Sequence, residues 1–292
     1  MNVLLTGASG FIGSHLASAL RAAGYVVIAA RREIEAGTAA VQADFTRDLS
    51  ARDWLPKLAG IDAVVNAVGI LREHGAQTFE RIHKRAPQAL FTACVAAGVR
   101  RIVQISALGA DRGMTRYFLS KRAADDYLAT LPLEWTIVRP AMVFGPDGSS
   151  ARLFTALARL PVVPLPGHGE QRLQPIHIDD LTEAVVRALG DASLNHVRID
   201  LMGPQSLSLR ELLVGLRTTM HLRPPHFLPI PMPLVRAGAH VAGLIAMSPL
   251  DRETLAMLEA GAGGDPTPTC RLLGRAPRAV APAQVQSVNR GQ

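Results

Sequence analysis

The sequence predicts a doubly wound α/β protein, in which a parallel sheet carries helices on both faces, followed by a smaller C-terminal region. Apolar runs of strand length alternate with helical periodicity through the first half of the chain, which is typical of parallel sheets. A glycine-rich turn follows the first apolar run, and prolines gather in the second half. Hydrophobic residues make up 48% of the 292 residues, which is ample for a sizeable core.

The individual elements follow from these patterns. Short runs of Val, Ile, Leu and Ala predict buried strands at residues 3–6, 25–30, 63–67, 101–106 and 135–139. Longer stretches with helical periodicity predict helices at 11–23, 78–97 and 114–129. Because strands and helices alternate, we expect the strands to pair in parallel.

The distribution of prolines changes after Pro140. From there, prolines cluster between residues 161 and 166 and again between 224 and 233. We therefore expect a core domain over residues 1–150 and a smaller, loop-rich region over 151–292, part of which returns to the core sheet.

Three glycines stand between the first predicted strand and the first predicted helix, spaced G-x-x-G-x-x-G. Glycines there permit a tight turn and let the backbone approach a pyrophosphate at the helix N-terminus. An ordinary glycine turn is the plainer alternative, but the strand and helix on either side match the context of a dinucleotide site. The predicted binding residues of this loop are Gly7, Ser9, Gly10, Phe11, Ile12 and Gly13.

The second predicted strand runs into Arg31 and Arg32. An NAD-preferring site usually presents an acid there, whereas guanidinium groups suit the 2′-phosphate of NADP. A solvated basic pair is the alternative. We expect NADP as the cofactor, with NAD as the less favoured choice.

Tyr117 and Lys121 stand four residues apart, which places them on one face of a predicted helix. A nearby cation favours the phenolate, so the pair is suited to general acid or base catalysis. The chain has 31 Lys and Arg residues, of which only Lys57, Lys84 and Lys121 are lysines, and this suggests a chemical need for lysine at position 121. Ser106 ends a predicted strand, where it would serve a ligand or cap a turn.

These segments together resemble the short-chain dehydrogenase/reductase superfamily, specifically its extended and atypical branches, which include NAD(P)-dependent epimerases and dehydratases. The resemblance rests on TGASGFIG at 6–13, ADF at 43–45, NAVG at 66–69, Ser106, Tyr117 with Lys121, RPAMVFGP at 139–146 and PIHIDD at 175–180. More narrowly, VVNAVGI, QISALGA and RPAMVFGP are similar to the accessory nucleotide-binding subunit of respiratory complex I and its bacterial relatives.

The resemblance implies a Rossmann fold and a role for each matching position. Tyr117 would be the acid/base, Lys121 would lower its pKa and bind the nicotinamide ribose, and Ser106 would polarise a substrate carbonyl. The residues implied to contact the cofactor beyond the glycine loop are Arg31, Arg32, Asp44, Phe45, Ala67, Val68, Gly69, Lys121, Pro140, Ala141 and Val143.

Some positions depart from the family pattern. Only eleven positions separate Ser106 from Tyr117, which leaves little room for the loop with which epimerases recognise nucleotide sugars. His83 falls near the family's helical Asn, as a stand-in or as an ordinary packing histidine. Asp179 and Asp180 are expected to cap a helix rather than to bind a metal.

The composition excludes several other classes. Two cysteines without neighbouring ligands predict neither a disulfide framework nor a zinc site. The basic residues that give the net charge of +7 are scattered along the chain among few aromatic residues, which disfavours nucleic-acid binding.

The N-terminus lacks a secretory signal, so we expect a cytoplasmic protein. The charge-free stretch 237–250 is too short to span a bilayer and is expected to be buried, to face a partner or to lie on a membrane.

Two functions stay open on this basis. The first is an NADP-dependent oxidoreductase acting on a carbonyl or secondary alcohol of a small molecule. The alternative is a non-catalytic dinucleotide-binding scaffold or assembly subunit, like the complex I accessory subunit. The sequence predicts no metal ion, and it leaves the substrate and the oligomeric state undetermined.

Overall fold

The computed structural model describes residues 1–34, 39–242, 252–261 and 263–280. The strands are β1 (Asn2–Thr6), β2 (Val26–Arg31), β3 (Ala40–Gln42), β4 (Ala63–Asn66), β5 (Arg101–Ile105), β6 (Glu134–Pro140), β7 (Val143–Phe144), β8 (Val162–Pro166), β9 (Arg172–Leu173), β10 (Ile176–His177), β11 (Val197–Leu201), β12 (Leu207–Ser208) and β13 (His226–Ile230). The α-helices are α1 (Phe11–Ala22), α2 (Ala51–Trp54), α3 (Ala86–Ala97), α4 (Arg116–Ala129), α5 (Ser149–Arg159), α6 (Ile178–Gly190), α7 (Leu209–Thr219), α8 (Met232–Ala242), α9 (Arg252–Ala260) and α10 (Thr267–Leu273).

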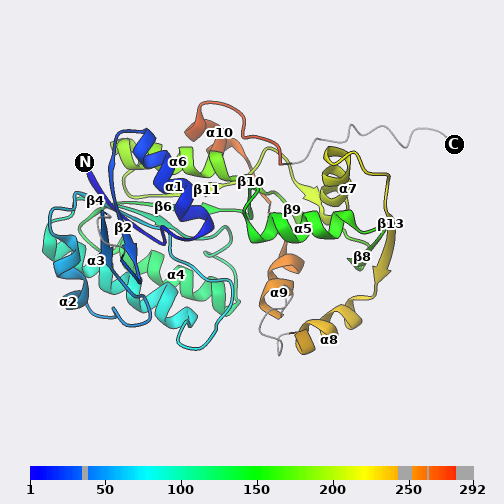
Figure 1. The fold of residues 1–292 in the computed structure, drawn as a ribbon, viewed down its shortest axis with the longest axis horizontal. Helices are drawn as coiled ribbons and strands as arrows, with labels where there is room; N and C mark the ends of the chain where they lie inside the picture. Colours follow the sequence, from blue (N-terminus) through cyan, green and yellow to red (C-terminus); the bar gives the residue numbers. More distant parts are fainter. Residues whose placement is uncertain (35–38, 243–251, 262, 281–292) are drawn as a thin grey trace. The chain divides into compact units, whose positions relative to one another are not determined.

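The chain forms two compact units, and the first is built on a seven-stranded sheet. This unit comprises Met1–Pro140, Ile178–Leu201 and Arg271–Gly274. Its strands lie in the order β11-β6-β5-β4-β1-β2-β3, and each neighbouring pair is parallel (Figure 1). The predicted doubly wound α/β class is thereby confirmed. The sheet includes β11, which comes from the second half of the chain.

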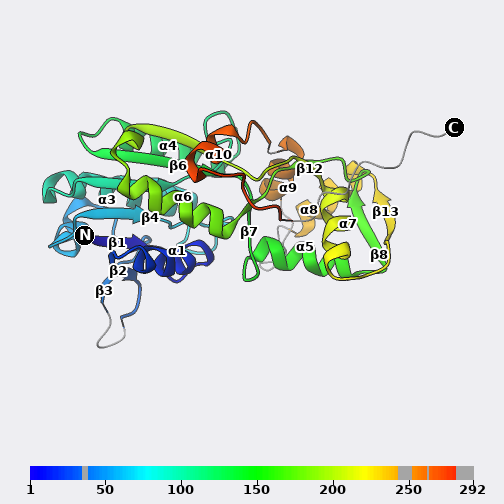
Figure 2. The same cartoon turned by 90° about the horizontal axis from the view of Figure 1, so that it is seen from above.

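Helices cover both faces of this sheet. Figure 1 shows α1 and α6 on one face and α2, α3 and α4 on the other, and Figure 2 looks onto the α1 and α6 side. The core between the sheet and the second helix layer joins strand residues such as Leu4 and Ile102 to helix residues such as Phe91 and Leu128. The strands are apolar on both faces because both are covered.

The predicted helix over 78–97 is interrupted. Residues Glu80–Arg85 form a π-helix that continues directly into α3. Pro87 stands at the start of α3 and has no N–H to donate to the carbonyl of His83, four residues earlier. The wider π-turn accommodates this missing donor, and such turns are frequent at functional sites.

The second unit comprises Ala141–His177, Met202–Cys270 and Arg275–Gln292. It holds three two-stranded sheets, β10-β7, β12-β9 and β13-β8, around a core in which α5 and α7 pack together. The chain first leaves the sheet unit at Pro140, whereas the expected boundary lies at residue 150. Asp179 and Asp180, the acids expected to cap a helix, lie in the first turn of α6.

The charge-free stretch 237–250 falls only partly on described residues. Residues 237–242 form the last part of α8, while residues 243–250 lie outside the described residues. Of the helices that can be described, none has the length and apolar character needed to cross a membrane.

Candidate active site

A ladder of buried polar side chains crosses the carboxyl ends of β1, β4 and β5. The hydroxyl of Thr6 donates to Asn66 Oδ1 at 2.5 Å, and Asn66 Nδ2 donates to Gln104 Oε1 at 2.7 Å. The three side chains are almost completely buried. They hold three neighbouring strand ends in register, at the sheet edge where ligands bind in this fold class.

Two glycines of the loop between β1 and α1 are required by backbone packing. Gly7 has φ +71°, and a Cβ there would lie 2.8 Å from the carbonyl oxygen of Ala67. A Cβ at Gly13 would lie 1.9 Å from the carbonyl oxygen of Gly7. These two positions let the loop touch the segment after β4 and the first turn of α1.

Gly10 differs from these two glycines. A Cβ there would meet only the Gly7 carbonyl oxygen, at 3.3 Å, so packing within the chain tolerates a side chain better. Gly10 caps α1 without a side-chain hydrogen bond, and the first turn of α1 has no acidic residue. The N–H groups of this turn therefore suit an anion such as a pyrophosphate. Ser9 is exposed, and Phe11 and Ile12 are half-buried.

The predicted Tyr and Lys lie on one buried stripe of α4. The helix begins after Thr115, whose side chain accepts a hydrogen bond from the backbone N–H of Phe118. Tyr117, Lys121 and Asp125 follow at intervals of four residues, and all three are buried. The spacing thus places a phenol, an amine and a carboxyl group along one face.

Lys121 reaches the end of β5 and the segment after β4. Its Nζ donates to the carbonyl oxygen of Ile105 at 3.1 Å and to that of Val68 at 3.4 Å. A Cβ at Gly69 would lie 3.2 Å from the same nitrogen. Burial lowers the pKa of Lys121 to about 8, with the negative charge of Asp125 acting in the opposite direction.

Tyr117 is enclosed by aromatic rings. Its ring meets those of Phe79, His83 and Phe118 edge to face, with centroids 5.3 to 5.9 Å apart. Burial, with a smaller contribution from Asp125, raises the pKa of Tyr117 to about 12. This direction is opposite to the lowered pKa that the family resemblance implied, because burial and the charge of Asp125 both act to raise it.

Ser106 does not present a free hydroxyl. Its Oγ donates to Asp125 Oδ2, and its side chain is buried. Burial raises the pKa of Asp125 to about 6, against the lowering effect of the Ser106 hydrogen bond. The other oxygen, Oδ1, has no hydrogen-bond partner among the described residues. In this geometry the hydroxyl proton of Ser106 is directed to Asp125, and the expected role of Ser106 in polarising a substrate stays a prediction.

His83 is the site residue whose role the sequence left open. Its Nε2 accepts the N–H of Ile70 at 3.0 Å, so the proton lies on Nδ1, which donates to Ser120 Oγ at 3.0 Å. Burial, followed by the charge of Lys121, lowers the pKa of His83 to about 2. A histidine fixed in the neutral state holds the segment after β4 in place through the hydrogen bond from Ile70. The π-helix that carries it had no sequence signal except Pro87.

The predicted adenine side follows β2 and β3. Arg31 and Arg32 are exposed. Asp44 accepts hydrogen bonds from the backbone and hydroxyl of Thr46 at 2.9 and 2.7 Å. Burial works to raise the pKa of Asp44, but these hydrogen bonds and nearby arginines leave it lowered. Phe45 packs edge-on against Trp54 in the core, so its side chain is committed to packing.

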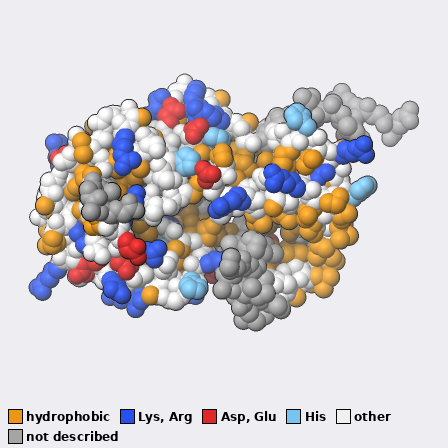
Figure 3. Space-filling model, viewed as in Figure 1, with side chains coloured by type: hydrophobic (Ala, Val, Ile, Leu, Met, Phe, Trp, Pro, Cys, Tyr) orange, Lys and Arg blue, Asp and Glu red, His pale blue; other side chains and the backbone are white. Residues whose placement is uncertain are grey.

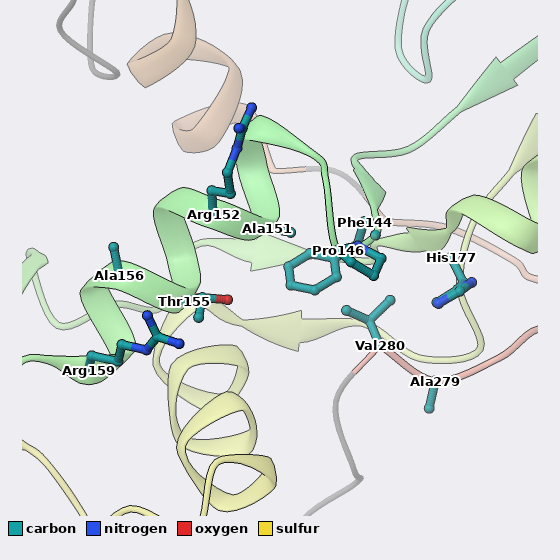
Figure 4. A pocket seen from close by; sticks show the side chains of 11 residues that line it. Phe144, Pro146, Ala151, Arg152, Thr155, Ala156, Arg159, His177, Ala279 and Val280 are labelled. Atoms are coloured by element: carbon teal, nitrogen blue, oxygen red, sulfur yellow. The ribbon is translucent and has the colours of Figure 1, made fainter. Parts of the chain in front are cut away.

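The remaining predicted residues lie around the end of β6. Pro140 ends that strand in the first unit, whereas Ala141 and Val143 belong to the second. The second unit contains a cavity of about 570 Å³. Figure 4 shows Arg159 and Thr155 of α5 beside it, with His177 and Val280 on another wall. None of the predicted catalytic residues lines this cavity.

Solved structures share this fold. A nucleoside-diphosphate-sugar epimerase from Staphylococcus aureus has a TM-score of 0.75 at 20% identity, and the match covers 96% of this chain and 98% of that one. MoeE5 in complex with UDP-glucuronic acid and NAD has a TM-score of 0.71 at 24% identity, covering 96% and 94%. At these identities the likeness shows the fold.

Curated relatives extend the comparison. Ceramide reductase of Caulobacter vibrioides is 29% identical over 250 residues, covering 82% of this chain and 77% of that protein. The complex I alpha subcomplex subunit 9 of Arabidopsis thaliana is 28% identical over 188 residues, and the chain spans less than half of that relative. The family model described as the NAD dependent epimerase/dehydratase family matches residues 3–199. The chain therefore belongs to the NAD dependent epimerase/dehydratase family.

Proposed function

We propose that the protein is an NADP-dependent reductase that acts on the carbonyl group of a small molecule. The observation that carries the proposal is the stripe on α4: Tyr117 and Lys121 lie together, and Lys121 binds the backbone at the end of β5 and in the segment after β4. Membership of the NAD dependent epimerase/dehydratase family supports a nicotinamide dinucleotide as the class of cofactor. The similarity to a ceramide reductase supports reduction rather than epimerisation.

The loop after β1 fits a dinucleotide. A side chain at Gly10 would fill the space above the N-terminus of α1, where a pyrophosphate would bind. Lys121 and the backbone of Ala67–Gly69 would hold the nicotinamide half, since they meet at the same sheet edge. When bound, reduced nicotinamide would supply a hydride to the substrate.

Tyr117 would supply the proton. With a pKa of about 12, its phenol is protonated at neutral pH and can donate to the oxygen of a carbonyl as that oxygen gains negative charge. The reverse reaction needs a phenolate, which burial disfavours. At neutral pH Tyr117 is therefore in the form that donates a proton during reduction of a carbonyl.

The preference for NADP rests on the two exposed arginines at the end of β2. Replacing Arg31 and Arg32 by Ala should weaken NADP(H) binding by about 1.5 to 3 kcal/mol, the usual contribution of charged hydrogen bonds to a phosphate. The affinity for NAD(H) should change little, because NAD(H) lacks the 2′-phosphate. Titration calorimetry with both cofactors measures the difference. A wild-type protein that binds NAD(H) as tightly as NADP(H) would contradict the assignment.

A second function, a dinucleotide-binding scaffold, is favoured by two observations. The chain is similar to subunit 9 of complex I from Arabidopsis thaliana and, at 25% identity, from Mus musculus. Ser106 is also bound to the buried Asp125 and offers no hydroxyl to a substrate. In a scaffold, cofactor would raise thermal stability by mass action without being consumed.

The two functions are separated by a direct assay. Cofactor released from the purified protein is identified by mass spectrometry, and consumption of NADPH is then followed with a panel of ketones, aldehydes and quinones. The panel includes a ceramide whose secondary alcohol has been oxidised to a ketone. A reductase consumes NADPH with at least one substrate. A scaffold retains the cofactor and consumes none.

A further inference from the structure

The second unit carries an exposed apolar face on its β13-β8 sheet. On this β8–β13 face, Val162 is 49% exposed and Leu228 is 51% exposed. Leu160, Leu222 and Leu234 flank the two strands and are 41%, 40% and 63% exposed. Soluble proteins rarely gather large apolar side chains on one outward face without a binding role.

The register of the two strands shows that this face is a regular feature of the fold. The strands are parallel, with His226 opposite Val162 and Leu228 opposite Pro164, so all four residues point to one side. The alternate residue Val163 is completely buried and packs in the core of the second unit. The apolar side chains on the outer face are therefore additional to those that the core requires.

A buried arginine fixes the segments that enter both strands. Arg217 of α7 donates from Nη1 to the carbonyl oxygen of Leu160 at 2.8 Å and to that of Ala158. Its Nε donates to the carbonyl oxygen of Arg223 at 2.7 Å. Because one side chain holds both segments, the face is held in a defined shape before any partner binds.

The two segments that form this face carry charge of one sign. Residues 155–169 and 218–236, which contain the two strands and their flanks, include Arg159, Arg223, Arg236 and three histidines but no Asp or Glu. Arg159 and Arg223 are exposed, and Arg236 pairs with Glu259 of α9. In Figure 3, apolar side chains gather over the part of the surface where Figure 1 draws β13.

We propose that the β8–β13 face docks on a membrane surface that contains anionic lipids. Exposed apolar side chains enter the interfacial region of a bilayer, and arginines beside them bind phosphate headgroups. A second copy of the chain fits less well, since an isologous contact would bring two basic rims together. The anionic lipid surface complements both the apolar centre and the basic rim.

The test is co-sedimentation of the full chain with vesicles. Wild-type protein should pellet with phosphatidylcholine vesicles containing about 30 mol% phosphatidylglycerol, and less with phosphatidylcholine alone, because the anionic lipids attract the arginines. Binding should fall when salt is raised from about 0.1 M to about 0.5 M, since the screening length shortens. Leu228→Asp should lower vesicle affinity at least about tenfold, because it puts a charge in the apolar centre. Replacing Arg159 and Arg223 by Ala should weaken the dependence on phosphatidylglycerol.

Val95→Asp is the matched control, because Val95 is 38% exposed on α3 in the first unit. It should bind vesicles like the wild type, and thermal melts should show that all variants are folded. The proposal is overturned if the wild type does not pellet, or if Leu228→Asp binds as well as the control. It is also overturned if the wild type is a dimer in solution that Leu228→Asp dissociates, because the face is then an interface between copies.

Discussion

At the scale of single residues, burial decides the protonation of the candidate site. Tyr117, Lys121 and His83 lie within one cluster, and burial disfavours the charged form of each. The sequence could predict the Tyr–Lys pair, because a spacing of four places both on one helix face. It could not predict the pKa of Tyr117, since two of the enclosing rings, Phe79 and His83, come from a distant part of the chain.

Because His83 is held neutral, we expect the free energy of unfolding to depend on pH. The folded pKa is about 2 and the unfolded value is about 6.5, so the unfolded chain binds one more proton as pH falls through this window. The free energy of unfolding should therefore drop by up to about 1.4 kcal/mol per pH unit from this group below about pH 6. His83→Gln removes that contribution.

Urea unfolding of the wild type and of His83→Gln between about pH 7.5 and pH 4 measures the effect. The difference in unfolding free energy between the two proteins should shift in favour of the variant as pH falls. Asp125 titrates in the same range in both proteins, so its effect cancels in the comparison. A difference that stays constant with pH would show that His83 is not held neutral by the fold.

Lys121 makes a second prediction at this scale. Lys121→Ala should lower both cofactor affinity and turnover, because the amine would serve the ribose and the phenol together. Lys121→Arg should restore little, since a planar guanidinium cannot replace a compact ammonium between two carbonyl oxygens. Fluorescence titration with NADPH and steady-state turnover are the two measurements. Full cofactor affinity in Lys121→Ala would exclude the ribose contact.

At the scale of elements, the loop from β1 into α1 follows the sequence closely. The strand, the glycine spacing and the start of α1 agree with the pattern, because each requirement is local. The π-helix before α3 and the two-residue strands β7, β9 and β12 were not predicted. Such short strands have no periodicity of their own and form only where a distant segment supplies a partner.

The loop glycines should separate binding from folding. Gly10→Val should fold and lose dinucleotide affinity, because its side chain enters the space expected for the pyrophosphate and meets only the Gly7 carbonyl within the chain. Gly13→Ala should instead unfold at lower temperature, since its Cβ would lie 1.9 Å from that carbonyl. Thermal melts with and without NADPH distinguish them. Near-native affinity in a folded Gly10→Val protein would identify the loop as a plain turn.

At the scale of the whole molecule, the chain passes several times from one compact unit to the other. The sheet class was predictable because alternating strands and helices allow few arrangements. The exact residue at which the chain passes from the first unit to the second was not predictable. Pro140 and Ala141 are neighbours in the sequence, and only tertiary contacts assign them to different units. The role expected for Ser106 also depended on such contacts, because its partner Asp125 lies on α4.

The measurement that tests the central claim most directly is turnover of NADPH by the wild type and by Tyr117→Phe, with a carbonyl substrate found in the panel. The account predicts that the variant loses about two to four orders of magnitude in turnover, the usual contribution of a positioned general acid, while its NADPH affinity is unchanged because the ring still packs. Tyr117 itself should add no pH dependence to the wild-type rate of reduction through the neutral range, since its phenol stays protonated. Equal turnover by the wild type and Tyr117→Phe would contradict the account.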